Sequence, residues 1–188
     1  KRERTSELAK SGHWRRCSNE MFIWPRHAGF ERVICGSPAA AIAGTVMGAA
    51  QINVLFDQLL IKEPGTREPT PWHHDLPFWP FQGAQICSLW LALDEVTADS
   101  GAVEYIKGSH RWGKRYQPTS FVGDGRYQQD GLEPLPDIEA MRGDFDIVRF
   151  DMEPGDCTLH HALTLHGAPG NRRTDRRRRA YVIRWGGR

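Results

Sequence analysis

The residues that most directly indicate chemistry are a His-x-Asp triplet, His73 to Asp75, and a distant histidine, His166. Two imidazoles and one carboxylate on one side of a metal form the facial ligand set of non-haem Fe(II), which leaves positions open for a co-substrate and O2. The triplet alone is a weak indication, because short motifs arise by chance in a chain with 8 histidines. Rigid and aromatic residues around it suit the wall of an apolar pocket, although some of them must pack in the core. They are Pro71, Trp72, Pro77, Phe78, Trp79, Pro80 and Phe81.

Three histidines of the segment HHALTLHGAPGN compete for the third ligand position: His160, His161 and His166. His166 precedes a glycine and a Pro-Gly turn, so we expect it at a strand end, where a side chain can project toward a site. We expect the other two in the core or behind the ligands, where a histidine hydrogen bond can orient a ligand.

A cluster of six arginines follows, in residues 172–179 (RRTDRRRR). An arginine fork binds both oxygens of a carboxylate, so one of these side chains could anchor a dicarboxylate co-substrate beyond the metal. Arg178 shares a strand face with Ala180, whereas Arg177 and Arg179 share the opposite face, and parity alone does not choose between them. Most of the six must lie in solvent.

Nucleic-acid binding is the competing interpretation of this arginine run. The chain has a net charge of +2, and the run holds six Arg and one Asp, so the remainder of the chain is slightly acidic. A nucleic-acid footprint normally needs positive charge spread over a face, so we regard this function as the less favoured one.

Length and composition bound the class of protein. The 188 residues, 39% of them hydrophobic, can bury one sizeable core, and we expect one domain over 1–188. No apolar run is long enough to span a bilayer and the first ten residues lack the apolar core of a signal peptide, so we expect a cytoplasmic protein without a membrane partner. The four cysteines form no Cys-x-x-Cys pair, and we interpret them as reduced thiols that mostly fill the core.

The pattern of elements predicts a mainly β fold with flanking helices, a barrel or sandwich. Residues 1–36 are polar and read as an irregular segment, with Trp14, Phe22 and Trp24 as anchors. Ser37 and Pro38 predict the start of a helix over 38–49. Residues 111–145 read as a long loop suited to a lid, with a helical turn near 137–142. The predicted strands are 52–62, 84–94, 102–107, 146–151, 156–162 and 180–185.

From about residue 57 to 185 the chain resembles the phytanoyl-CoA dioxygenase family of Fe(II)/2-oxoglutarate oxygenases. The matching segments occur in the family's order and are LLIKEPGTREPTPWHHD, SLWLALDEVTADSGAVEYIKGSHRWG and EPGDCTLHHALTLHGAPGNRRTDRRRRAYVIRW. The resemblance implies a double-stranded β-helix, a jelly-roll barrel of the cupin type. It also implies Fe(II), 2-oxoglutarate and O2 as cofactor and co-substrates, with the metal ligands His73, Asp75 and His166.

The same resemblance assigns the co-substrate pocket. An Arg-x-Ala setting selects Arg178, with Arg177 as the fallback because one residue is inserted after His166 relative to the family. Ala168 stands where the family often has a serine that contacts the co-substrate. Lys62 and Trp90 fall where the family lines this pocket, and core packing is the alternative for Trp90.

The implied activity is hydroxylation of a small organic or acyl-type substrate with a hydrophobic part, releasing succinate and CO2. A cupin-like metal enzyme without oxidative chemistry, a nucleic-acid-binding module and a catalytically silent relative are the alternatives. Only the 2-oxoglutarate-dependent hydroxylase requires a buried arginine for the co-substrate. No motif in the sequence selects the substrate.

Overall fold

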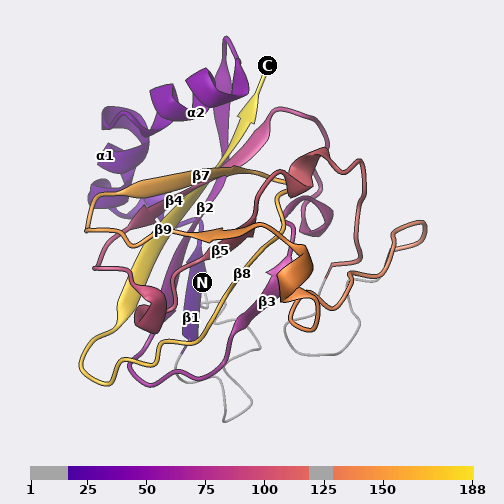
Figure 1. Cartoon of the computed structure of the whole chain (residues 1–188). Coiled ribbons are helices and arrows are strands. Elements are labelled where there is room, and N and C mark those ends of the chain that lie inside the picture. Colours follow the sequence, from indigo (N-terminus) through magenta and orange to yellow (C-terminus); the bar gives the residue numbers. More distant parts are fainter. Residues whose placement is uncertain (1–16, 119–128) are drawn as a thin grey trace.

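Two antiparallel sheets face each other across the interior of the molecule (Figure 1). The structure is a computed structural model and describes residues 17–118 and 129–188. The predicted features at 1–16, Trp14 among them, and the middle of the 111–145 loop lie outside these residues.

The first sheet has five strands in the order β1-β2-β9-β4-β7. They are β1 (Cys17–Met21), β2 (Ile52–Lys62), β9 (Arg178–Gly187), β4 (Ile86–Ala92) and β7 (Cys157–His161). Strands β2, β4 and β9 are runs of apolar and β-branched residues, as a sheet covered on both faces requires. The strands predicted from the sequence at these positions are confirmed.

The second sheet has four short strands in the order β3-β8-β5-β6. They are β3 (Thr70–His73), β8 (His166–Ala168), β5 (Glu104–Ile106) and β6 (Ile147–Arg149). Together the sheets form the double-stranded β-helix, so the predicted fold class is confirmed.

Two helices, α1 (Ala28–Gly36) and α2 (Ala39–Met47), cover the outer face of the first sheet (Figure 1). Ala39 and Ala43 of α2 pack with Leu89, Tyr181 and Ile183, whose side chains point out of the barrel. The 38–49 helix is therefore confirmed, and the Ser37 hydroxyl accepts a hydrogen bond from the Ala39 amide at 3.2 Å. Pro38 takes the N-cap position instead of the first helical position. No helix among the described residues is long and apolar enough to cross a membrane.

Alternation along the first sheet places the opposite set of side chains inside the barrel. Arg178, Val182 and Arg184 of β9 line an interior cavity together with Lys62 of β2 and Trp90 of β4. The register aligns Phe56, Arg184, Ser88 and His160 in one row across β2, β9, β4 and β7.

The expectation of an irregular segment over residues 1–36 is wrong for its described part. Residues 17–36 contain β1, a 3-10 turn η2 (Trp24–Arg26) and α1. The buried carboxylate of Asp57 organises this segment, because it accepts hydrogen bonds from the amides of Ile23 and Trp24 and from the Tyr181 hydroxyl. This long-range contact has no local sequence pattern.

The described parts of the 111–145 loop lie on the outer face of the second sheet. Ile138 and Tyr116 pack there against Trp72, Ile106 and Leu165. The remaining short turns are the 3-10 helices η3 (Leu76–Phe78), η4 (Ala98–Ser100), η5 (Ser109–Arg111) and η6 (Arg142–Asp144). The segment that could bear on a lid, 119–128, is outside the described residues.

The four cysteines are free thiols, as expected, but their placement corrects the prediction. Cys87 alone is buried; Cys35 and Cys157 are exposed, and Cys17 lies at the edge of the cavity.

Candidate metal centre and co-substrate pocket

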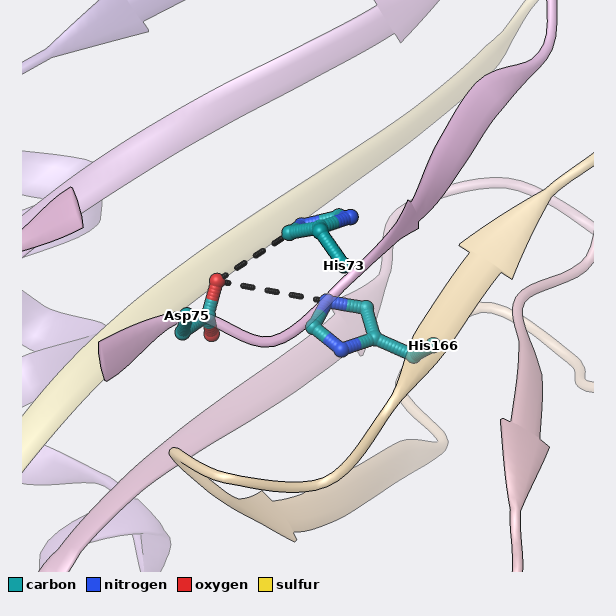
Figure 2. Close-up of side chains that lie close together, drawn as sticks. All are labelled: His73, Asp75 and His166. Atoms are coloured by element: carbon teal, nitrogen blue, oxygen red, sulfur yellow. Dashed lines mark ion pairs between the residues drawn. The ribbon is translucent and has the colours of Figure 1, made fainter. Parts of the chain in front are cut away.

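The pairing of two short strands brings the predicted ligands together. His73 is the last residue of β3 and lies directly opposite His166, the first residue of β8. Asp75 follows at the N-cap of η3, where the turn carries its side chain back toward the two rings. Figure 2 shows the three side chains converging. One possible ligand atom of each lies within 4.8 Å of the others, and all three residues are buried.

The hydrogen bonds of the two histidines select the tautomer that binds a metal. The Nδ1 atom of His73 lies 2.7 Å from the carbonyl of Pro71, and Nδ1 of His166 lies 2.9 Å from the carbonyl of Thr164. A carbonyl only accepts, so each Nδ1 carries the proton and each Nε2 offers its lone pair. The Nε2 atoms lie 3.8 and 3.9 Å from Oδ1 of Asp75.

Asp75 is fixed from its other oxygen. The Ser88 hydroxyl donates a hydrogen bond to Oδ2 at 2.7 Å, and Nε2 of His160 lies 3.5 Å from the same oxygen. Burial on its own would raise the pKa of Asp75, but the neighbouring His160, His166 and Arg184 side chains hold that pKa well below its usual range. Oδ1 of this carboxylate therefore faces the two imidazoles as an ionised oxygen ligand.

Burial also keeps the imidazoles neutral. It is the largest cause that lowers the pKa of His73 and that of His166, the latter well below its usual value. A neutral imidazole is the form that binds a metal. The donor set, its tautomers and its spacing fit a divalent transition metal held by three protein ligands, with further positions open.

Arg178 lies at the far end of the cavity and is only 2% exposed. Its Nη2 donates to the carbonyl of Gly101 at 3.0 Å, and its Cζ lies 5.3 Å from the centre of the Trp90 ring. Burial lowers the pKa of Arg178 to about 10, so the side chain remains charged at neutral pH. Gly101 has φ +87°, and a Cβ there would lie 2.8 Å from the carbonyl oxygen of Pro169. Only glycine therefore allows the backbone at residue 101 to lie so close to Pro169.

Lys62 accompanies Arg178. Its Nζ donates hydrogen bonds to the carbonyls of Ala168 at 3.3 Å and Pro169 at 2.6 Å. Burial and, secondly, the nearby Arg178 charge lower the pKa of Lys62 to about 7. Ala168 lacks the serine hydroxyl that the family often has at this position, but its backbone carbonyl binds Lys62.

A single cavity of about 210 Å³ connects these groups. Its lining includes the three candidate ligands at one end and Lys62, Arg178 and Ala168 at the other, with Trp90 between them. Trp90 also packs in a buried cluster with Ala92 and Val182, so both interpretations of this residue describe the same wall. The three candidate ligands, Arg178 and the other residues that the family resemblance assigned to the pocket thus line one cavity.

The structure separates the remaining histidines. His160 is buried beside Asp75 and lines the cavity, as expected. The same expectation is wrong for His161, which is half-buried on the opposite face of β7 and bonds the carbonyl of Ala84 at 2.9 Å. Sequence reasoning missed Ser88 and Arg184; strand alternation from Trp90 and from Arg178 could have pointed to both.

The arginine run does not form a basic surface. Each of its exposed members has an acidic neighbour within 4 Å, while Arg178 is buried. The pairs are Arg172–Asp99, Arg173–Asp175, Arg176–Glu95, Arg177–Glu63 and Arg179–Asp94. This neutralisation argues against the nucleic-acid-binding alternative.

The fold and the cavity define a double-stranded β-helix protein with a two-histidine, one-carboxylate centre beside a buried arginine. The phytanoyl-CoA dioxygenase (PhyH) family model matches residues 4–180, and the chain belongs to this family. The match begins well before residue 57, where the resemblance was noted.

Individual relatives agree with this assignment. A protein of Stutzerimonas stutzeri, named as a probable alpha-ketoglutarate-dependent hypophosphite dioxygenase, is 32% identical over 124 residues, which are 62% of this chain and 39% of that protein. The carbocyclase SnoK from nogalamycin biosynthesis superposes with a TM-score of 0.74 at 24% identity, over 92% of this chain and 64% of SnoK. The epimerase SnoN, in complex with Fe3+, alpha ketoglutarate and nogalamycin RO, gives 0.71 at 21% identity, over 91% and 63%. The chain thus spans about two fifths of the curated relative's length, and the two structures show the fold.

Proposed function

We propose that this chain is the core of an Fe(II)- and 2-oxoglutarate-dependent dioxygenase that hydroxylates a small organic substrate and releases succinate and CO2. The observation that carries the proposal is the buried cluster of His73, Asp75 and His166 in one cavity with Arg178. Family membership supports the same reaction class.

In this proposal the three clustered side chains hold Fe(II) on one side only. The Nδ1 hydrogen bonds of the two histidines and the Ser88 hydrogen bond to Asp75 orient the ligand atoms before the metal binds. When bound, Fe(II) supplies the activation of O2 for oxidation of a C–H bond, and the protein supplies geometry and a dry cavity.

Arg178 and Lys62 are proposed to hold the distal carboxylate of 2-oxoglutarate. Both are nearly completely buried at the end of the cavity away from the metal, where an anionic co-substrate balances the charge of Arg178 and favours the protonated form of Lys62. Trp90 would flank the carbon chain, and Ala168 would contribute its carbonyl to position Lys62. SnoN, which has the same fold, was solved in complex with Fe3+ and alpha ketoglutarate.

A cupin-like enzyme without oxidative chemistry is the second candidate, since it would share the metal ligands. It has no need of a fully buried arginine at the cavity end, and Arg178 therefore favours the oxygenase. The substrate is expected to be a small molecule with a hydrophobic part, because aromatic and aliphatic groups form much of the wall.

Succinate formation tests the proposal. Purified protein with Fe(II), ascorbate, O2 and 2-oxoglutarate should release succinate, and Asp75→Ala should not. The Ser88→Ala variant is a matched control that keeps all three ligands and should retain part of the turnover. Metal loading without any succinate from the wild type, in the presence of candidate substrates, would favour the non-oxidative enzyme.

A further inference from the structure

A second buried arginine lines the same cavity, and its only role described so far is the effect of its charge on Asp75. Arg184 lies six residues after Arg178 on β9, its side chain points into the barrel, and it is 8% exposed. It sits in the sheet row of Phe56, Ser88 and His160, at the end of the cavity where Ser88 holds Asp75.

The guanidinium of Arg184 is packed but not satisfied. Its Cζ lies 5.2 Å from the centre of the Phe56 ring and 5.8 Å from that of Trp79. Within residues 17–118 and 129–188, its buried Nε and Nη1 atoms have no hydrogen-bond acceptor. Cation–π contacts contribute to holding the group but leave these N–H donors unpaired, and unpaired buried donors are costly.

The carboxylates near Arg184 are already engaged. Asp57 and Asp75 are the acidic groups whose charges act on it. Asp57 accepts hydrogen bonds from three donors, the amides of Ile23 and Trp24 and the hydroxyl of Tyr181. Asp75 is held by Ser88 at one oxygen and faces the metal position with the other. A bound divalent metal would add positive charge beside Arg184, and Asp75 would bind that metal rather than compensate the charge of Arg184.

We propose that Arg184 binds an anionic oxygen group of the substrate, a carboxylate in the simplest case, at the end of the cavity opposite the 2-oxoglutarate anchor. The inference rests on the proposed function and adds a substrate class to it: small acids with an apolar part that contacts the aliphatic wall of the cavity, formed in part by Leu60, Val103 and Val182. Arg178 and Arg184 would then divide two anions between the two ends of one strand, about 20 Å apart at their Cα atoms by strand geometry.

Benzoate and its neutral analogue benzamide test this division by calorimetry. Both are titrated anaerobically into protein loaded with Mn(II) and saturated with 2-oxoglutarate, so that Arg178 is occupied. The wild type should bind benzoate at least about tenfold more tightly than benzamide, because a charge-assisted hydrogen bond is available to the acid alone. Arg184→Met and Arg184→Gln should lose this preference, and Arg184→Lys should keep part of it. Arg177→Met, an exposed arginine on the approach to the same strand, is the control and should behave as the wild type.

The affinities for Mn(II) and 2-oxoglutarate, measured first, separate the possible failures. A wild type that binds neither of them contradicts the proposed function itself. A wild type that binds both but does not prefer benzoate overturns the role of Arg184, and so does a preference that persists in Arg184→Met. Loss of Mn(II) binding in both Arg184→Met and Arg184→Gln would show that Arg184 positions Asp75 and would also overturn substrate binding.

Discussion

The two candidate histidine ligands are oriented by the same local device, a hydrogen bond from Nδ1 to the carbonyl two residues earlier. This hydrogen bond is made within three residues, so the orientation of each histidine is set locally at its strand end. Asp75 differs, because its orientation depends on Ser88 from another strand. At the residue scale the site therefore combines two locally set ligands with one that the barrel must position.

Removing either imidazole should abolish metal binding. His73→Ala and His166→Ala leave two ligands, which cannot hold a labile divalent metal in a three-ligand site. Anaerobic calorimetry with Mn(II) measures this directly. His161→Ala is the matched control, because that histidine faces the other side of β7 and bonds Ala84, and it should bind Mn(II) as the wild type does. Wild-type affinity in His166→Ala would remove that residue from the ligand set.

Arg178→Met should retain Mn(II) but bind 2-oxoglutarate at least about tenfold more weakly, since charge-assisted hydrogen bonds on the order of 1.5–3 kcal/mol are lost. Arg177→Met should leave the affinity unchanged, because Arg177 is exposed and paired with Glu63 at 3.2 Å. Titration of 2-oxoglutarate into the Mn(II)-loaded variants gives both values. The reverse result would make Arg177 the anchor.

Lys62 should couple 2-oxoglutarate binding to proton uptake. Its pKa is lowered to about 7 by burial, so at about pH 8 it is mostly neutral in the free protein. A bound carboxylate favours the protonated amine and raises that pKa, so affinity should fall as pH rises above about 7. Calorimetry in two buffers of different ionisation enthalpy measures the uptake. Lys62→Met should show none, and equal uptake in that variant would assign the proton to another group.

At the element scale, the strands with long apolar sequence patterns could be predicted and the short strands β3 and β8 could not. Strands β2, β4 and β9 are long apolar runs between turns, and their positions were evident. Strands β3 and β8 are short and contain proline or glycine, so the candidate ligands could be named from the sequence but the pairing of His73 with His166 could not. Helix α1 was missed although its apolar residues Phe30, Val33 and Ile34 have helical spacing, because it is short and no side chain caps its start. Which face Arg178 takes also required the packed sheet, since parity permits either.

Asp57 offers a test of how the N-terminal segment is attached. In Asp57→Asn one oxygen becomes a donor that faces the amides of Ile23 and Trp24, so we expect a loss of unfolding free energy on the order of 1.5–3 kcal/mol. Tyr181→Phe removes one neutral donor and should cost less, about 0.5–1.5 kcal/mol. Urea denaturation of both variants measures the difference. Equal stabilities of Asp57→Asn and the wild type would mean that the segment is held by its apolar contacts alone.

At the scale of the whole molecule, the barrel places charge inside and neutralises it outside. The arginine run is paired with acidic side chains on the surface, whereas Lys62, Arg178 and Arg184 are buried along the cavity. Bound anions and a bound metal ion would stabilise such an interior, because they compensate its buried charges. The prediction of one domain over 1–188 is compatible with this arrangement and stays a prediction.

The metal dependence of 2-oxoglutarate binding tests most directly whether His73, Asp75, His166 and Arg178 form one oxygenase site. Anaerobic calorimetry should find one Mn(II) per chain, and 2-oxoglutarate should bind tightly to the loaded protein but at least about tenfold more weakly to the metal-free protein and to His166→Ala. Equal 2-oxoglutarate affinity with and without metal, or no Mn(II) bound by the wild type, would contradict a shared site for metal and co-substrate.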